Sequence, residues 1–265
     1  MIVIGEKLNT SIDVIREAVQ NSDIETIKGI ALSQARAGAD YIDVNCGTFV
    51  DREPELLMWM TEILVEYTDK PLCIDSPNPQ AIEAALKVCG NGKPIINSIT
   101  GQRQRYNSIL PLILDYGTSV IGLCMNDDGI PDSVDARVSV AERLVEDLVR
   151  DGVDYEDIFI DPMVQPMATD QSSGQMTLKT IAGIKERLPG IKTICGLSNI
   201  SFGLPERSSV NKAFLVLAIN AGLDAAILDP TDHGIVSLAY AAKLMSSQDD
   251  YCLGYLESIR KLNGR

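Results

Sequence analysis

Asparagine, aspartate and serine residues follow several short apolar runs in this chain of 265 residues. One run, residues 193–197, breaks at Gly196 and leads directly into Ser198 and Asn199. The amide of Asn199 carries both a donor and an acceptor, so it can stay hydrogen-bonded to a reacting atom that changes its protonation state. Serine and asparagine also turn chains into helices, and this stretch taken alone admits that interpretation too.

The other apolar runs end in the same way. Their polar end residues are Glu6 and Asn9, Asp43 and Asn45, Asp75 and Ser76, Asn97 and Ser98, Asn126, Asp161, and Asp229. A single aspartate in such a place is usually a cap or a turn residue. A whole series of them predicts one ligand site, provided that the runs are parallel strands whose carboxyl ends meet at one mouth.

The elements that must position these residues are short apolar runs alternating with helical patterns. The expected strands are residues 2–5, 41–45, 72–75, 94–97, 119–123, 158–161, 193–197 and 225–229. The expected helices include residues 23–37, 55–67, 79–88, 134–150, 177–187 and 210–221. Eight strand–helix units in a chain of this length predict an α/β fold, a single-domain (β/α)8 TIM barrel over residues 1–265 with an extra C-terminal helix at 251–262. An open doubly wound sheet would leave two edge strands unexplained.

The predicted mouth is rich in hydrogen-bond acceptors and poor in cations. It therefore suits a ligand that presents N–H donors, such as a pterin, whose ring N–H and exocyclic amino group one carboxylate can accept together. Magnesium binding by Asp43, Asp75 and Asp161 is the rival interpretation, because Mg²⁺ prefers oxygen ligands. Phosphate binding is disfavoured, since neither a GxxxxGK[ST] loop nor a GxGxxG motif follows a strand.

Composition excludes several other classes of protein. The net charge of −14 argues against nucleic-acid binding, and no apolar run approaches the ~20 residues of a membrane span. The first residues read as a strand and not as a signal peptide, which predicts a cytoplasmic location. His233 is the only histidine, so the sequence can hardly supply a histidine metal site or a Ser-His-Asp triad. The six cysteines form no CxxC pair and are expected to be reduced.

The order and spacing of the polar strand ends resemble a known family. The segments IGEKLN, YIDVNCGT, LCIDSPN, INSITG, GLCMN, IDPMVQP, CGLSNISFG and GLDAAILDP resemble the methyltetrahydrofolate:corrinoid methyltransferases along essentially the whole chain. These enzymes are pterin-binding barrels, related to dihydropteroate synthase and to the folate domain of cobalamin-dependent methionine synthase.

The resemblance implies roles for particular residues. Asp75, Asn97 and Asp161 match the residues that hold the pterin, and Asn199 matches the amide near N5, the nitrogen that carries the methyl group. The other implied pterin contacts are Gly196 and Ser198 along the ring, Asp43 and Asn126 at the cavity floor, and Arg207 at the ring edge or the folate tail. A solvated loop charge is the alternative for Arg207.

The implied activity is methyl transfer between N5 of tetrahydrofolate or 5-methyltetrahydrofolate and the cobalt of a corrinoid (cobalamin), in either direction. The chain lacks a DxHxxG corrinoid-binding signature, so a separate corrinoid protein is the expected partner. The resemblance further implies a homodimer and no metal held by the chain itself.

Three other functions compete with this one on the same barrel. They are a dihydropteroate synthase, a non-catalytic scaffold and a magnesium-dependent lyase or aldolase. A dihydropteroate synthase would carry a lysine after the seventh strand and Arg-x-His after the eighth, where this chain has GLSN and ILDP. A non-catalytic scaffold that binds folate or a corrinoid protein would not need Asn199.

Overall fold

Eight parallel strands close into a barrel in the computed structural model, which describes residues 1–90, 92–232 and 234–262, so that His233 lies outside the described residues. The strands are hydrogen-bonded in sequence order, and β8 pairs with β1. They are β1 (Ile2–Asn9), β2 (Tyr41–Asn45), β3 (Leu72–Asp75), β4 (Ile95–Thr100), β5 (Ser119–Leu123), β6 (Ile158–Asp161), β7 (Lys192–Gly196) and β8 (Ala225–Leu228). The predicted single-domain TIM barrel is confirmed.

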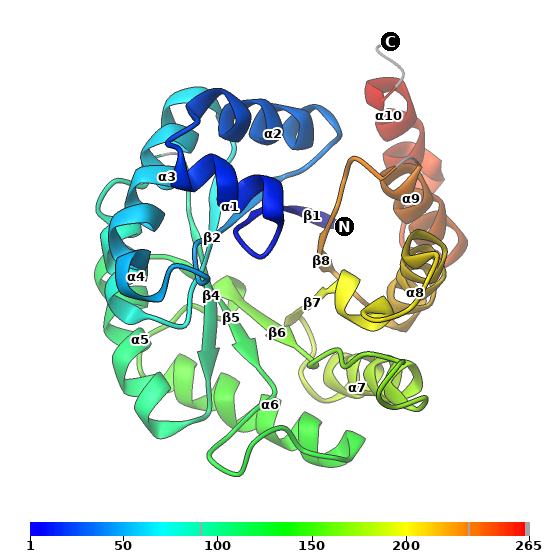
Figure 1. Cartoon of the computed structure of the whole chain (residues 1–265). Coiled ribbons are helices and arrows are strands. Elements are labelled where there is room, and N and C mark those ends of the chain that lie inside the picture. The colour runs from blue at the N-terminus through cyan, green and yellow to red at the C-terminus, as the bar shows by residue number, and fades with distance from the viewer. Residues whose placement is uncertain (91, 233, 263–265) are drawn as a thin grey trace.

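The helices form a ring outside the strands (Figure 1). They are α1 (Asp13–Gln20), α2 (Ile24–Arg36), α3 (Glu53–Tyr67), α4 (Pro79–Leu86), α5 (Arg103–Tyr116), α6 (Val134–Arg150), α7 (Ser173–Arg187), α8 (Arg207–Ala221), α9 (Ile235–Met245) and α10 (Leu253–Leu262). The predicted C-terminal helix is α10, which packs on α9. No helix in the described part of the chain is long and apolar enough to cross a membrane.

Local sequence signals explain where several helices begin and end. The side chains of Asp23 and Asn78 accept hydrogen bonds from the backbone N–H groups of Thr26 and Gln80, and so cap the first turns of α2 and α4. Gly117 and Gly222 end α5 and α8 in the left-handed conformation that glycine adopts without strain.

The barrel interior has an apolar layer with a polar layer above it. Side chains of a strand alternate between the two faces, so residues two apart point the same way. The inward apolar cluster is Ile4, Cys73, Ile95, Ile121, Phe159, Ile194 and Ala225. Two residues further along the same strands come Glu6, Asp75, Asn97, Leu123, Asp161, Gly196 and Ile227. The apolar layer therefore closes the barrel beneath a mouth lined mainly by polar groups.

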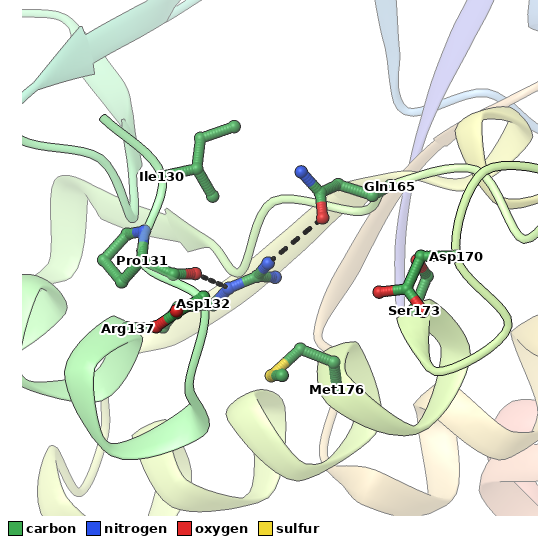
Figure 2. Close-up of a pocket in the computed structure, with 8 residues that line it drawn as sticks. All are labelled: Ile130, Pro131, Asp132, Arg137, Gln165, Asp170, Ser173 and Met176. Atoms are coloured by element: carbon green, nitrogen blue, oxygen red, sulfur yellow. Dashed lines mark hydrogen bonds between the residues drawn. The ribbon is translucent and has the colours of Figure 1, made fainter. Parts of the chain in front are cut away.

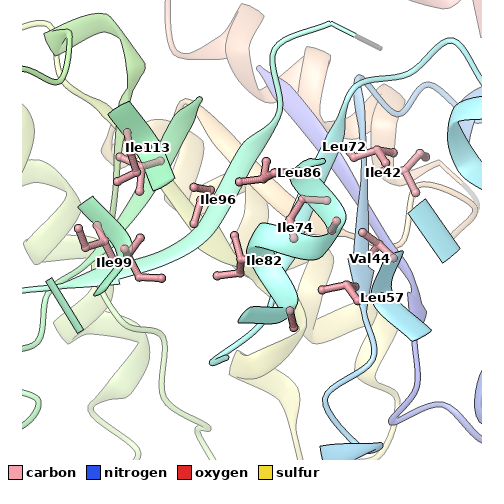
Figure 3. Close-up of a cluster of buried hydrophobic side chains, with 14 of the residues drawn as sticks. Ile42, Val44, Leu57, Leu72, Ile74, Ile82, Leu86, Ile96, Ile99 and Ile113 are labelled. Carbon is pink, nitrogen blue, oxygen red and sulfur yellow. The ribbon is translucent and has the colours of Figure 1, made fainter. Parts of the chain in front are cut away.

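The outward faces of the strands pack against the helices. Figure 3 shows part of this core, in which isoleucine, leucine and valine from β2, β3 and β4 meet side chains from α3, α4 and α5. Cys46, Cys124 and Cys195 are buried as free thiols in the outer core, and Cys73 is buried as a free thiol in the inward cluster. They behave as small apolar side chains.

Two strands extend further than the sequence predicts. β1 continues to Asn9 and β4 continues to Thr100, and each shows a register shift near its carboxyl end, between Gly5 and Leu8 and between Asn97 and Ile99. A bulge of this kind redirects side chains and is common next to active sites. The polar residues in these bulges interrupt the apolar pattern, which is why the predicted strands stop too early.

Candidate active site

A cavity of about 730 Å³ opens at the carboxyl ends of the strands. Its volume is in the range of small-molecule sites. The lining residues come from the ends of most strands and from the loops that follow them: Glu6, Asn9, Ser11, Ile12, Asp43, Asp75, Asn97, Ser98, Leu123, Asp161, Met163, Val164, Gly196, Ser198, Asn199, Phe202, Arg207 and Ile227. All the predicted site residues except Asn126 lie in this lining.

Asp75 and Asn97 stand side by side on neighbouring strands, because they are direct partners in the pairing of β3 with β4. The Asn45 amide donates a hydrogen bond of 2.8 Å to Oδ2 of Asp75. Burial raises the pKa of Asp75 to about 6, although this amide favours the carboxylate. At neutral pH the pair offers an ionised carboxylate and an amide to a ligand.

Asp161 is the matching acceptor at the end of β6. The Met163 backbone N–H donates to its Oδ1 at 2.7 Å, and the Gly196 backbone N–H also favours the ionised form. Burial outweighs both and raises the pKa of Asp161 to about 6. Asp75 and Asp161 are thus two acidic acceptors in the cavity, one on either side of Leu123 at the end of β5.

Asp43 lies deeper, almost entirely buried on β2. Burial raises its pKa well above the usual range, and the neighbouring charge of Asp75 adds to the effect. Its Oδ1 atom is buried without a hydrogen-bond partner in the described chain. A protonated Asp43 can donate as well as accept, and an unpaired buried oxygen is a group that a ligand could satisfy.

Asn199 lies at the exposed rim, in the 3-10 turn Leu197–Ser201 that follows β7. Within the described chain, no hydrogen bond holds its side-chain amide. A Cβ atom at Gly196 would lie 3.0 Å from the Nδ2 atom of Asn199, so the glycine leaves room for the amide. The amide is therefore free to bond a ligand in the cavity.

The carboxyl group of Glu6 also lies in this site, although no role is predicted for it. The Ser198 hydroxyl donates a hydrogen bond of 2.6 Å to Oε1 of Glu6, which reaches the cavity from the β1 bulge. Burial raises the pKa of Glu6, against the Ser198 hydrogen bond. Glu6 is among the predicted polar strand ends but has no function predicted for it, because its contact with Ser198, 192 residues away in the chain, is not visible in the sequence.

Arg207 has the one cationic side chain among the described lining residues. It begins α8 and donates to the Ser198 carbonyl at 2.8 Å and to the Ser201 hydroxyl at 3.1 Å. Its guanidinium also lies 6.0 Å from the ring centre of Phe202. Phe202 is 65% exposed and lines the same rim.

Asn126 does not reach the cavity. β5 ends at Leu123, and the chain then turns so that the Asn126 and Gly129 backbones pair with each other. The Oδ1 atom of Asn126 accepts a hydrogen bond from the Asp128 N–H at 3.0 Å, so the side chain stabilises its own turn.

Asp43, Asp75 and Asp161 do not gather as a metal site. Among the described residues, no three His, Cys, Asp or Glu side chains form a group that could hold a metal ion.

Carboxylates and amides at the mouth of a (β/α)8 barrel suit a small ligand that presents N–H donors. The family model for pterin-binding enzymes matches residues 5–229, and the chain belongs to that family. The predicted kinship with pterin-binding barrels is thus confirmed.

Two relatives and one solved structure show the range of similarity. The chain is 36% identical over 264 residues to the methylcorrinoid:tetrahydrofolate methyltransferase of Eubacterium limosum, covering 98% of this chain and 97% of that one. It is 34% identical to the methionine synthase of Mycobacterium leprae over 86% of this chain, which is a fifth of that longer protein (20%). Dihydropteroate synthase from Xanthomonas albilineans shares the fold, with a TM-score of 0.69 and 21% identity over 92% of each chain.

Proposed function

We propose that this protein is a methyltransferase that moves a methyl group between N5 of tetrahydrofolate and the cobalt of a corrinoid carried by a separate corrinoid protein. The observation that carries the proposal is the uncommitted amide of Asn199 at the rim of a cavity whose walls hold Asp75, Asn97 and Asp161. The 36% identity to a methylcorrinoid:tetrahydrofolate methyltransferase over nearly the whole of both chains supports it.

The pterin ring binds in the lower part of the cavity. Asp75 and Asp161 accept its N–H donors, and Asn97 adds a donor and an acceptor. The unpaired Oδ1 atom of Asp43 forms a hydrogen bond with the inner edge of the ring. Apolar side chains such as Leu123 and Ile227 flank the ring faces. Gly196 and Ser198 contact the ring edge, and Arg207 faces the part of the folate that leaves the cavity.

Asn199 acts at N5. When tetrahydrofolate is methylated, the lone pair of N5 forms the bond to the methyl carbon, and the electron pair of the carbon–cobalt bond stays on the corrinoid. The N5 proton then leaves. The Asn199 carbonyl accepts from N5–H before transfer, and its N–H donates to the N5 lone pair afterwards. Such a bond accelerates the reaction only to the extent that it strengthens as charge develops on N5.

Glu6 takes up the N5 proton. It is the carboxyl group of the cavity that contacts Ser198, the neighbour of Asn199 in the chain. In the reverse direction the same group, holding its proton to a higher pH than an ordinary glutamate, protonates N5 so that the methyl group can leave.

The corrinoid protein docks over the mouth of the barrel, where it supplies the carbon–cobalt chemistry. The name of the Eubacterium limosum relative favours the direction from methylcorrinoid to tetrahydrofolate. We further propose that the enzyme works in the cytoplasm as a homodimer. The described helices include no membrane span, which is consistent with that location, and analytical ultracentrifugation tests the dimer.

The experiment that tests the function follows the corrinoid absorption spectrum. The protein is mixed with methylcobalamin and tetrahydrofolate, and separately with reduced cobalamin and 5-methyltetrahydrofolate. Interconversion in either mixture, repeated with a methylated corrinoid protein, is the expected result. Folate binding without methyl transfer to or from any corrinoid would instead establish a scaffold.

A further inference from the structure

Arg105 reaches from the first turn of α5 to the residues that follow Asp75 and Asn97. Its Nε and Nη2 atoms donate to the Ser98 carbonyl at 2.9 and 2.6 Å. Nη2 also donates to the Ser76 carbonyl at 2.8 Å, and Nη1 donates to the Pro77 carbonyl. Ser76 directly follows Asp75 in the chain, and Ser98 directly follows Asn97. One guanidinium thus ties together the two peptides that follow these cavity residues.

Arg137 makes the same kind of contact two strands further round the barrel, after β6. It lies in the first turn of α6 and is almost fully buried. Its Nη1 atom donates to the carbonyls of Pro162 and Met163, both at 2.9 Å, and its Nε atom donates to the Pro131 carbonyl at 2.9 Å. Pro162 directly follows Asp161.

The surroundings of Arg137 separate it from the ligand cavity. It lines a different crevice of about 150 Å³, between the loops that follow β5 and β6, with Ile130, Pro131, Asp132, Gln165, Asp170, Ser173 and Met176. Figure 2 shows its guanidinium directed at Pro131 and Gln165 within this crevice. The contacts of both arginines are with carbonyl oxygens, which indicates support of the loops and not recognition of an anion.

We propose that Arg105 and Arg137 are positioning residues for pterin binding, which rests on the proposed function. Each holds the peptide immediately after a pterin-binding side chain: Arg105 after Asp75 and Asn97, and Arg137 after Asp161. Arginine suits this work because its planar fork presents five N–H donors in fixed directions, whereas lysine offers a single compact charge. Fixing these loops sets the acceptor geometry before the ring arrives, which lowers the cost of binding.

The test compares Arg105→Lys and Arg137→Lys with two controls of the same chemistry. Arg103→Lys changes an exposed arginine of α5, and Arg143→Lys changes an exposed arginine of α6. Calorimetry measures the dissociation constant for tetrahydrofolate and for a tetrahydropterin without the tail. Each test variant should weaken both ligands by a similar factor, on the order of 10- to 100-fold, as is typical when the support of a preorganised site is lost. The controls should stay within about twofold of wild type.

A kinetic measurement separates positioning from a general loss of structure. The KM for folate should rise in both test variants while the KM for the corrinoid protein stays unchanged. Folded variants that bind the tetrahydropterin as wild type does would overturn the inference. The two arginines hold different strand ends, so either variant suffices if the other does not fold. A wild-type protein that fails to bind folate would contradict the proposed function itself.

Discussion

At the scale of single residues, the cavity contains groups that the protein holds with very different strength. Asp161 accepts two backbone N–H groups and Asp75 accepts an amide, whereas no bond within the described chain holds the Asn199 amide. Tightly held acceptors suit ground-state recognition of a ring. An amide that is free to adjust suits an atom whose charge changes during reaction.

Replacing Asn199 by alanine should slow methyl transfer by roughly one to three orders of magnitude, the usual effect of losing one transition-state hydrogen bond. Folate affinity should change little, because the ring acceptors remain. Single-turnover kinetics with a saturating corrinoid measures the step, and Asn107→Ala on the exposed face of α5 is the control. An unchanged rate would remove Asn199 from the mechanism.

Asp75→Asn should weaken folate binding yet stabilise the ligand-free protein at pH 7. The folded pKa of about 6 exceeds the unfolded value of about 3.9, so ionisation begins to cost stability above about pH 4 and costs the full amount above pH 6. The neutral amide removes that cost, on the order of 1–3 kcal/mol. The gain should shrink as pH falls through 6 and disappear near pH 4, where wild-type Asp75 is protonated in both states.

Urea unfolding of both proteins between pH 4 and pH 7 measures this difference. A variant that is less stable than wild type at pH 7 would show that the Asp75 charge is already compensated in the empty site.

Glu6→Gln should slow the methylation of tetrahydrofolate and change its pH dependence. A base with a raised pKa is ionised only at higher pH, so the wild-type rate should rise with pH through that pKa. Glutamine cannot take a proton, so this rise should be missing, and the rate should fall by roughly 10²- to 10⁴-fold. Rate profiles from pH 5 to pH 8 test this; the same slope in both proteins would assign the proton to another group.

At the scale of elements, β1 and β4 each carry a bulge near the carboxyl end, beside polar residues of the mouth. The β1 bulge is held by Gln34 of α2, whose Oε1 atom accepts from the Lys7 backbone N–H at 2.9 Å. Gly5 lies directly against that side chain: a Cβ atom there would be 2.4 Å from the same Oε1 atom. Gly5 therefore permits the close contact between α2 and β1.

Gly5→Ala should destabilise the protein by about 1–3 kcal/mol, because the added methyl must displace a buried side chain. It should also slow methyl transfer, since Glu6 lies in the disturbed bulge. Gly29→Ala is the matched control within α2, with nothing within 4 Å of the added atom. That control should be neutral or stabilising by up to about 1 kcal/mol. Thermal unfolding and activity measured on both variants test the difference.

At the scale of the whole molecule, the proposed partner must cover the open end of the barrel. Apolar side chains stand exposed there on loops after the strands, including Val50, which is 74% exposed in the turn after β2, and Phe202 after β7. A corrinoid protein that docks on this face would bury them.

Val50→Asp should therefore slow methyl exchange with a corrinoid protein by about tenfold or more while leaving exchange with free cobalamin unchanged. Val149→Asp is the control, because Val149 is exposed in the last turn of α6, at the opposite end of the barrel. Equal effects on free and protein-bound corrinoid would place the docking surface elsewhere.

The sequence alone determined the number of strands, the barrel and most of the predicted residues that line the cavity. Apolar runs, capping residues such as Asn78 and terminal glycines such as Gly117 act over a few residues, so their meaning does not depend on distant contacts. Asp75, Asn97 and Asp161 could be assigned to the mouth because each ends such a run. Their resemblance to family motifs gave them a ligand class.

Only the tertiary structure decided which polar residues face the cavity. Glu6 meets Ser198 from the other end of the chain, Asn126 turns back into its own loop, and Arg105 and Arg137 look in the sequence like ordinary helix-surface charges. The physical reason is that side-chain direction depends on strand register and bulges. These are set by contacts between segments far apart in the chain, which no local pattern contains.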